Sequence, residues 1–252
     1  MPRMRAMHKA LVLSAGLMFG HAGIAASAEI KVFCTQALRT SLLELAPRFE
    51  KTSGHTVVLD VAPSGRLVAR IRDGGQADVL IANAANIDGL IADGKVAGPR
   101  IDLARAQVGI AIRAGAPKPD ISSPESVKRA LLNAKAVAYV AGGLSGNAFE
   151  GVLNKLGILE QVKAKAKIGS PAAGFVARGE ADIAVQQISE LIAVPGAELV
   201  GALPPGLDQV TQFSIGSLAA AKKNSAADAL IRFLVSEDAG AVIKAKGLTP
   251  ER

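Results

Sequence analysis

Residues 56–73 read TVVLDVAPSGRLVARIRD, and this stretch holds a strand, a turn and a helix in direct succession. Residues 56–61 are rich in β-branched side chains, which indicates a strand. The turn Pro63-Ser64-Gly65 leads into helical periodicity over 66–73, and Gly74 follows where that helix should stop. This order of elements is typical of an α/β fold with mostly parallel strands.

The same alternation continues on both sides of this stretch, so α/β architecture is expected throughout. Further strands are predicted at 30–34, 79–82, 107–112, 136–140, 183–185, 199–200 and 213–219. Further helices are predicted at 37–51, 86–93, 124–132, 148–156, 171–178, 226–235 and 238–246.

Two proline-rich stretches suggest how the chain divides. Pro117-Lys-Pro-Asp120 and Leu203-Pro-Pro-Gly206 bracket a middle section. In one interpretation the chain enters a second lobe at the first stretch and leaves it at the second; in the other, both are surface loops. We expect lobe 1 to comprise residues 29–112 and 208–252, and lobe 2 residues 113–207, with a crossing strand beside each junction.

The first 28 residues have the pattern of an export signal. Arg3, Arg5 and Lys9 precede an apolar run over 10–19, and Ala26-Ser27-Ala28 has the small-x-small form that a signal peptidase recognises. A membrane anchor is the alternative, but the run is far shorter than the roughly 20 apolar residues of a spanning helix. We therefore expect cleavage after Ala28 and a periplasmic location.

The composition after residue 28 excludes several classes of function. All four methionines and two of the three histidines lie in the signal, which leaves His55 and Cys34. One histidine and one cysteine cannot build a common zinc site, so we expect no metal and no cofactor. With no Trp and one Tyr, stacking on nucleic acid is not expected. Cys34, inside a predicted strand, is expected to be a buried small residue.

Polar turns after the predicted strands are candidates for an anion site. Loops at the carboxyl ends of parallel strands converge on a crevice, into which the following helices point free N–H groups. Thr35, Ser64, Ser145 and Ser170 lie in such turns, although a serine there is often only a helix cap.

Two arginines add positive charge beside these turns. Arg39 and Arg66 each lie in the first turn of a predicted helix, where a cation opposes the helix dipole. A bound anion would offset that cost, whereas an arginine that extends into solvent needs no ligand. Both interpretations stay open.

Catalysis has little support in the sequence. No serine lies in a G-x-S-x-G motif, no carboxylate pair is recognisable, and His55 follows a predicted helix end. We therefore expect a binding protein and not an enzyme.

The chain resembles the substrate-binding proteins of molybdate-type ABC importers, which are class II periplasmic binding proteins. The resemblance covers nearly the whole chain after the signal. It rests on IKVF at 30–33, FEKTSG at 49–54, APSGRL at 62–67, GQADVLIA at 75–82 and GEADIA at 179–184, in this order.

This resemblance implies two α/β lobes, each a mostly parallel sheet flanked by helices, joined by crossing hinge strands around a ligand cleft. It implies an anion held by neutral donors: the turn of Ser64 and Gly65, and the N–H groups of a second-lobe turn with Ser145, Gly146 and Asn147. It also implies a monomer that delivers its ligand to a membrane permease. Ala37 and Gln186 stand where that family has a serine and a tyrosine.

Three functions follow as hypotheses. The first is a receptor that captures a small anion for an importer, either a molybdate-like oxyanion or an organic carboxylate, since Arg39 and Arg66 suit carboxylate pairing. The second is a binding module that serves a sensor or another partner. The third is an exported enzyme on the same fold.

Overall fold

Two groups of parallel strands, one in each half of the molecule, form the sheets of the computed structural model, which describes residues 27–221 and 224–251. In lobe 1, β1 (Glu29–Cys34) lies parallel to both β2 (Thr56–Val61) and β3 (Val79–Asn83). β1 is connected to β2 by η1 (Gln36–Leu38) and α1 (Arg39–Ser53). β2 is connected to β3 by α2 (Ser64–Arg72), and α3 (Ala84–Ala92) follows β3.

Lobe 2 repeats this arrangement with shorter strands. β5 (Val137–Tyr139) lies parallel to β6 (Ala166–Ile168) and to β7 (Ile183–Gln187). The remaining elements of this lobe are α4 (Pro124–Asn133), α5 (Leu144–Leu156), α6 (Leu159–Lys163), α7 (Ala172–Ala177), α8 (Ile188–Leu191) and β8 (Ala197–Ala202).

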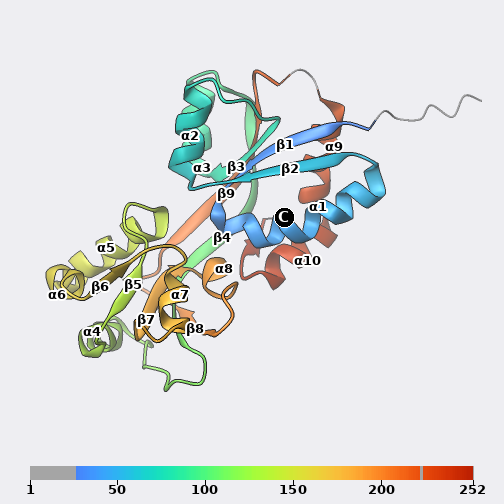
Figure 1. Ribbon diagram of the computed structural model, residues 1–252. Coiled ribbons are helices and arrows are strands. Elements are labelled where there is room, and N and C mark those ends of the chain that lie inside the picture. Colours follow the sequence, from blue (N-terminus) through green and yellow to red (C-terminus); the bar gives the residue numbers. More distant parts are fainter. Residues whose placement is uncertain (1–26, 222–223, 252) are drawn as a thin grey trace, which may run out of the picture.

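Two antiparallel strands join the lobes. β4 (Val96–Arg113) pairs with β9 (Val210–Leu218) along most of its length, and its far end pairs with β7 and β8 of lobe 2. The strand order is β2-β1-β3-β9-β4-β7-β5-β6, and Figure 1 shows these two strands as the narrow connection between the lobes. The predicted α/β fold with two lobes and crossing hinge strands is therefore confirmed.

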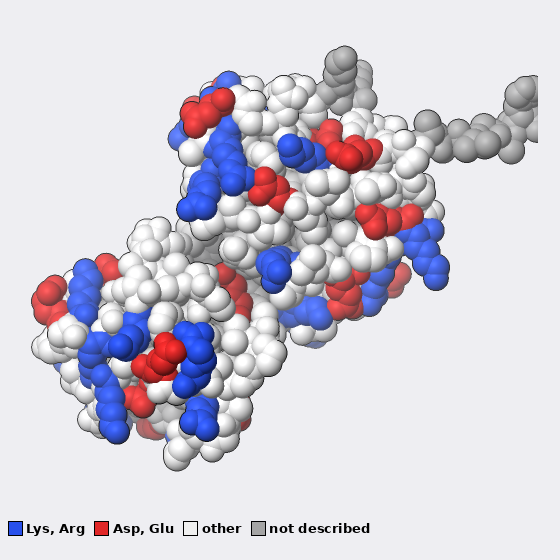
Figure 2. Space-filling view, in the orientation of Figure 1, with Lys and Arg blue, Asp and Glu red and all other residues white. Residues whose placement is uncertain are grey.

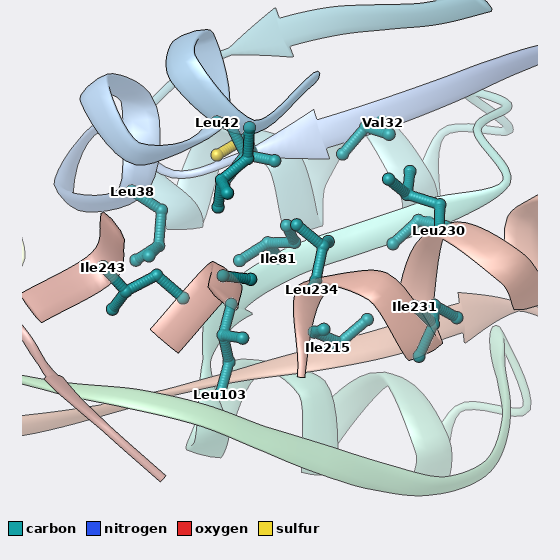
Figure 3. Close-up of a cluster of buried hydrophobic side chains, with 14 of the residues drawn as sticks. Val32, Leu38, Leu42, Ile81, Leu103, Ile215, Leu230, Ile231, Leu234 and Ile243 are labelled. Atoms are coloured by element: carbon teal, nitrogen blue, oxygen red, sulfur yellow. The ribbon is translucent and has the colours of Figure 1, made fainter. Parts of the chain in front are cut away.

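The end of the chain returns to lobe 1. α9 (Ser225–Leu234), α10 (Glu237–Ala245) and β10 (Thr249–Pro250) lie beside α1 and β4. Figure 3 shows Leu42 of α1, Leu230 of α9 and Ile243 of α10 pointing into one buried cluster, with Ile81 from the sheet. Lobe 2 has its own apolar clusters around Tyr139, Phe149 and Val185, and around Ala173 and Leu191. Separate cores let each lobe behave as a unit, as hinge closure requires.

The structure also differs from the sequence-based expectation. The short elements α6, β6, α8 and β10 were not predicted, and two predicted elements begin earlier than expected. α5 begins at Leu144 and not at 148, because Gly146 lets the first turn of the helix lie directly against the carbonyl of Val140. β4 begins at Val96, eleven residues before the predicted strand at 107, since it bends through two register shifts instead of alternating regularly.

An export signal is expected at residues 1–28. Residues 1–26 of this segment lie outside the described residues. Among the helices that the structure describes, none is long and apolar enough to cross a membrane.

Candidate functional site

A small cavity lies where the strand ends of the two lobes face each other. Its volume is about 180 Å³, which corresponds to the liquid volume of about six water molecules. It takes residues from both lobes: Thr35, Gln36, Ala37, Pro63, Ser64, Val140, Gly143, Leu144, Ser145, Ser170, Gln186, Gln187, Glu190 and Phe213. We refer to it as the cleft.

Lobe 1 contributes two hydroxyl groups that contact each other. Thr35 follows β1 and Ser64 begins α2, so both lie at the carboxyl ends of neighbouring parallel strands. The Ser64 hydroxyl donates to Thr35 Oγ1 at 3.0 Å, and both residues are almost fully buried. In this arrangement the Thr35 O–H is free to donate to a ligand, and the Ser64 O–H becomes free when it turns away from Thr35, so the pair offers neutral donors without a fixed charge.

Lobe 2 contributes the start of α5. Gly143 precedes this helix in an extended conformation and has no side chain to cap it, so N–H groups of the first turn stay free for another acceptor. Ser145 in the same turn is buried and lines the cleft. A helix start and a hydroxyl that meet at one cavity favour an anionic group there.

Two glutamines at the end of β7, Gln186 and Gln187, line the cleft. Gln186 Oε1 accepts the Ala172 N–H at 2.9 Å, which ties β7 to the start of α7. Gln187 Nε2 donates to Thr211 Oγ1 at 3.1 Å, and Gln187 Oε1 has no partner among the described residues. Because the two ends of an amide can exchange, one polar atom of Gln187 stays open to a ligand in either orientation.

A carboxyl group, Glu190, also lines the cleft. It lies on α8, directly after the two glutamines. Burial raises the pKa of Glu190 from 4.5 to about 7, while hydrogen bonds from the Gln186 side chain and the Gln187 backbone lower it by less. This carboxyl can therefore bind or release a proton near neutral pH, which an ordinary glutamate cannot.

The rest of the lining is uncharged and mostly apolar, with Gln36 and Ser170 as its polar members. Ala37, Pro63, Val140, Leu144 and Phe213 supply carbon surface, and neither Lys nor Arg is among the lining residues. Figure 2 shows most Lys and Arg side chains on the outer surfaces of both lobes, while the hollow between the lobes is uncharged, with basic and acidic side chains only at its edge. The lining therefore offers neutral polar groups and one carboxyl, and no cation.

The structure brings together some of the residues that the sequence analysis singled out. Six of the eleven candidates line the cleft: Thr35, Ala37, Ser64, Ser145, Ser170 and Gln186. The other five do not. Gly65, Arg39 and Arg66 are exposed. Gly146 is buried within the first turn of α5, against Val140, and Asn147 lines a separate hollow beside Lys155.

Sequence reasoning missed Gln187, Glu190 and Phe213. The polar run QQISE at 186–190 directly follows a buried strand, and this position was a signal that could have drawn attention to Glu190. Phe213 had no such signal, because it lies on β9, which reaches the cleft only where this strand crosses between the lobes.

Other side chains that could carry out chemistry do not line the cleft. Burial raises the pKa of Cys34 to about 12 and its thiol donates to the Thr35 carbonyl, so the prediction of a buried structural cysteine is confirmed. Within the described ranges, no group of three or more His, Cys, Asp or Glu side chains could hold a metal ion. A larger hollow of about 720 Å³, which we call the hollow behind lobe 2, lies between α4, the last residues of β4 and the amino end of β7, and shares no residue with the cleft.

Comparisons with known proteins agree with this architecture. The family model described as "Bacterial extracellular solute-binding protein" matches residues 30–249. Aconitate isomerase of a Pseudomonas species is 34% identical over 88% of this chain and 87% of its own. The molybdate-binding protein of Azotobacter vinelandii is 29% identical over 94% of this chain and 95% of its own.

Solved structures show the same fold. The periplasmic molybdate-binding protein of Azotobacter vinelandii superposes with a TM-score of 0.74 at 22% identity, covering 88% of this chain and all of the other. A sulfate-binding protein of Mycobacterium tuberculosis gives a TM-score of 0.70 at 18% identity, covering 88% and 87%. The predicted resemblance to the substrate-binding proteins of molybdate-type importers is thus confirmed, and the chain belongs to the bacterial extracellular solute-binding protein family.

Proposed function

We propose that the protein captures a small organic acid anion in the cleft and delivers it to a membrane permease outside the cytoplasm. The observation that carries this proposal is the composition of the lining, which combines neutral hydrogen-bond donors with a largely apolar wall. Membership in a family of extracellular solute-binding proteins supports the role of a receptor.

The apolar wall distinguishes the two kinds of anion. A tetrahedral oxyanion carries oxygen on every side, and oxygen atoms against Val140, Leu144 and Phe213 would lose hydrogen bonds to water without replacement. An organic acid places its carboxylates on the hydroxyl and N–H donors and its carbon skeleton on the apolar wall.

The departures from the molybdate pattern point the same way. Ala37 lines the cleft where the molybdate family has a serine, and Gln186, whose Oε1 already accepts the Ala172 N–H, stands where that family has a tyrosine. Each lost hydroxyl removes a hydrogen bond worth about 0.5–1.5 kcal/mol, and more when its partner is charged. Two such losses weaken a molybdate site by about tenfold or more.

Calorimetric titration of the purified protein tests this proposal. The ligands are molybdate, tungstate and sulfate on one side, and cis-aconitate, trans-aconitate and citrate on the other. We expect saturable binding of at least one organic acid and none of molybdate at the same concentration. Tight molybdate binding without binding of any acid would contradict the proposal.

A second candidate function is isomerisation of an unsaturated carboxylate in the same cleft. Two observations favour it: Glu190 carries a pKa of about 7 inside the cleft, and the relative with 34% identity is named aconitate isomerase. A carboxylate with this pKa can remove a proton from a carbon beside a double bond and return one at the other end of the allylic system. The double bond moves, and no oxidant or co-reactant is needed.

Incubation of the purified protein with cis-aconitate in D₂O distinguishes turnover from capture. Turnover predicts formation of trans-aconitate with deuterium on carbon, seen by proton NMR, and its loss in Glu190→Gln. A receptor that only captures its ligand leaves cis-aconitate unchanged at a rate equal to that of buffer.

A further inference from the structure

The ionisable group of the cleft has no charged partner. Glu190 lies on α8, and the elements with most contacts to α8 are β4, β7, β8, η1 and α7. The turn after α10 also lies against α8 at Gly247, and the neighbouring Lys246 pairs with Glu44 at 2.7 Å. β7, η1 and α7 contain no ionisable residue. Gln186 and Gln187, the two residues that hydrogen-bond to the carboxyl, are both neutral.

The charged residues of the other two elements are engaged elsewhere. On β4, Arg100 pairs with Asp88 and Asp102, and Arg105 pairs with Glu251. Arg113, at the end of β4, lines the hollow behind lobe 2. On β8, Glu198 pairs with Lys118 at 2.8 Å.

Arg39 directly follows η1, which packs against α8. It is exposed and is not among the lining residues. Among the described residues, no cation therefore balances an ionised Glu190 inside the cleft.

An acid anion in this cavity would meet a second carboxylate. The volume of about 180 Å³ leaves little room between a ligand and Glu190. An ionised carboxylate only accepts hydrogen bonds, so two of them that face each other without a donor or cation between them repel each other. One proton on Glu190 removes the repulsion and supplies the missing donor, as in sites where a protonated carboxylic acid donates to an oxyanion.

We propose that Glu190 takes up a proton when an organic acid anion enters the cleft and donates its O–H to a ligand carboxylate, so that capture is coupled to proton uptake. This inference rests on the proposed function. It adds that affinity depends on pH through one residue. A pKa of about 7 for Glu190 before the ligand binds means that this dependence falls in the neutral range.

The test is calorimetric titration of the purified protein with trans-aconitate in two buffers of different ionisation enthalpy. At about pH 8 we expect uptake of about one proton per bound ligand, and much less at about pH 5.5, where Glu190 is already protonated. Affinity should fall about tenfold for each pH unit above 7.

Two variants separate Glu190 from other groups. Glu190→Gln keeps a donor at this position and should bind with no proton uptake and with an affinity that does not depend on pH. Glu150→Gln is the matched control, since Glu150 lies on α5, contacts Tyr139 and Lys163, and is not among the lining residues. It should keep the uptake of the wild type.

Several results would overturn the proposal. Tight binding with equal proton uptake in the wild type and in Glu190→Gln would remove Glu190 from its role and leave the capture function intact. Deuterium on the ligand carbon that depends on Glu190 would make it a base and not a donor. If no organic acid binds, the proposed function fails and this inference fails with it.

Folding of the variant does not limit the test. If Glu190→Gln does not fold, carbon NMR of the Glu190 carboxyl in the wild type reports the same event. The carboxyl pKa should rise when trans-aconitate is added. An unchanged pKa in the ligand-bound protein would contradict the proposal.

Discussion

The two halves of the cleft are built from the same strand–turn–helix unit, but they differ in whether the first turn of the helix has room for an added side chain. In lobe 1, Gly65 lies in the first turn of α2, and a Cβ added there would meet nothing within 4 Å. In lobe 2, Gly146 lies in the first turn of α5, and a Cβ added there would lie 1.8 Å from the Val140 carbonyl oxygen. The lobe 1 half is therefore open at this point, whereas the lobe 2 half depends on close backbone packing.

The chemistry of the two halves differs as well. Thr35 and Ser64 give the lobe 1 half two neutral hydroxyls, which do not titrate in the physiological range. The lobe 2 half adds Glu190, whose pKa of about 7 makes it sensitive to pH. One half is a fixed set of donors, and the other can change its charge.

Substitution of the two glycines tests the difference in packing and should have the largest effect. Gly146→Ala forces the start of α5 away from β5 and should lower the free energy of unfolding by about 1–3 kcal/mol or more. Gly65→Ala should leave it unchanged or raise it by about 0.4–1 kcal/mol, since the unfolded chain loses freedom. Urea denaturation measures both, and equal effects would contradict the comparison.

Removal of one hydroxyl from each half should affect binding more than stability. Ser64→Ala and Ser145→Ala each remove a donor that lines the cleft. If each donates to a charged carboxylate, each change should weaken binding of the organic acid by about 1.5–3 kcal/mol, or roughly 10- to 100-fold. Calorimetry measures the affinities, and Ser236→Ala, at the cap of α10, is a control outside the cleft. A variant that binds as tightly as the wild type would exclude its hydroxyl from the site.

The charge difference between the halves predicts how stability depends on pH. The pKa of Glu190 is about 7 in the folded protein and near 4.5 in the unfolded chain, so the folded state holds the proton more tightly. Its stabilising contribution is complete below about pH 4.5 and is lost as pH rises through 7, with a change on the order of 2 kcal/mol.

The measurement is the free energy of unfolding of the wild type minus that of Glu190→Gln, determined at several pH values without ligand. We expect this difference to decline between about pH 4.5 and 7 and to be flat above. A difference that stays constant across this range would show that Glu190 titrates normally.

The exposed arginines should have the smallest effect. Arg39 and Arg66 both belong to lobe 1 and lie outside the cleft lining. Arg39→Ala and Arg66→Ala should each reduce affinity by less than about threefold, and the reduction should disappear at high salt, because exposed charges act at long range and are screened. A loss of 30-fold or more that persists at high salt would mean that the arginine pairs directly with the ligand.

Most of the fold could be predicted from the sequence, because its elements carry local signals. β2 occupies residues 56–61 as predicted, and α4 begins at Pro124 with the Ser123 hydroxyl accepting the Ser126 N–H. The four-residue helix α8 has no such signal, since one helical turn is too short to show a period. Its carboxyl was missed for this reason.

The candidate site could be predicted only in part. The turn residues Thr35 and Ser64 follow strands directly, and topology alone brings them to one edge. The exclusion of Arg39 from the lining depends on the direction in which a side chain leaves its helix, and the raised pKa of Glu190 depends on packing between α8 and elements distant in sequence, β4 among them. Sequence pattern carries neither.

A crystal structure of the protein soaked with trans-aconitate tests the central claim most directly. The account predicts the ligand in the cleft, with carboxylates on the Ser64 and Ser145 hydroxyls and its carbon skeleton against Phe213. Density for the ligand in the hollow behind lobe 2, with the cleft filled by water, would contradict it.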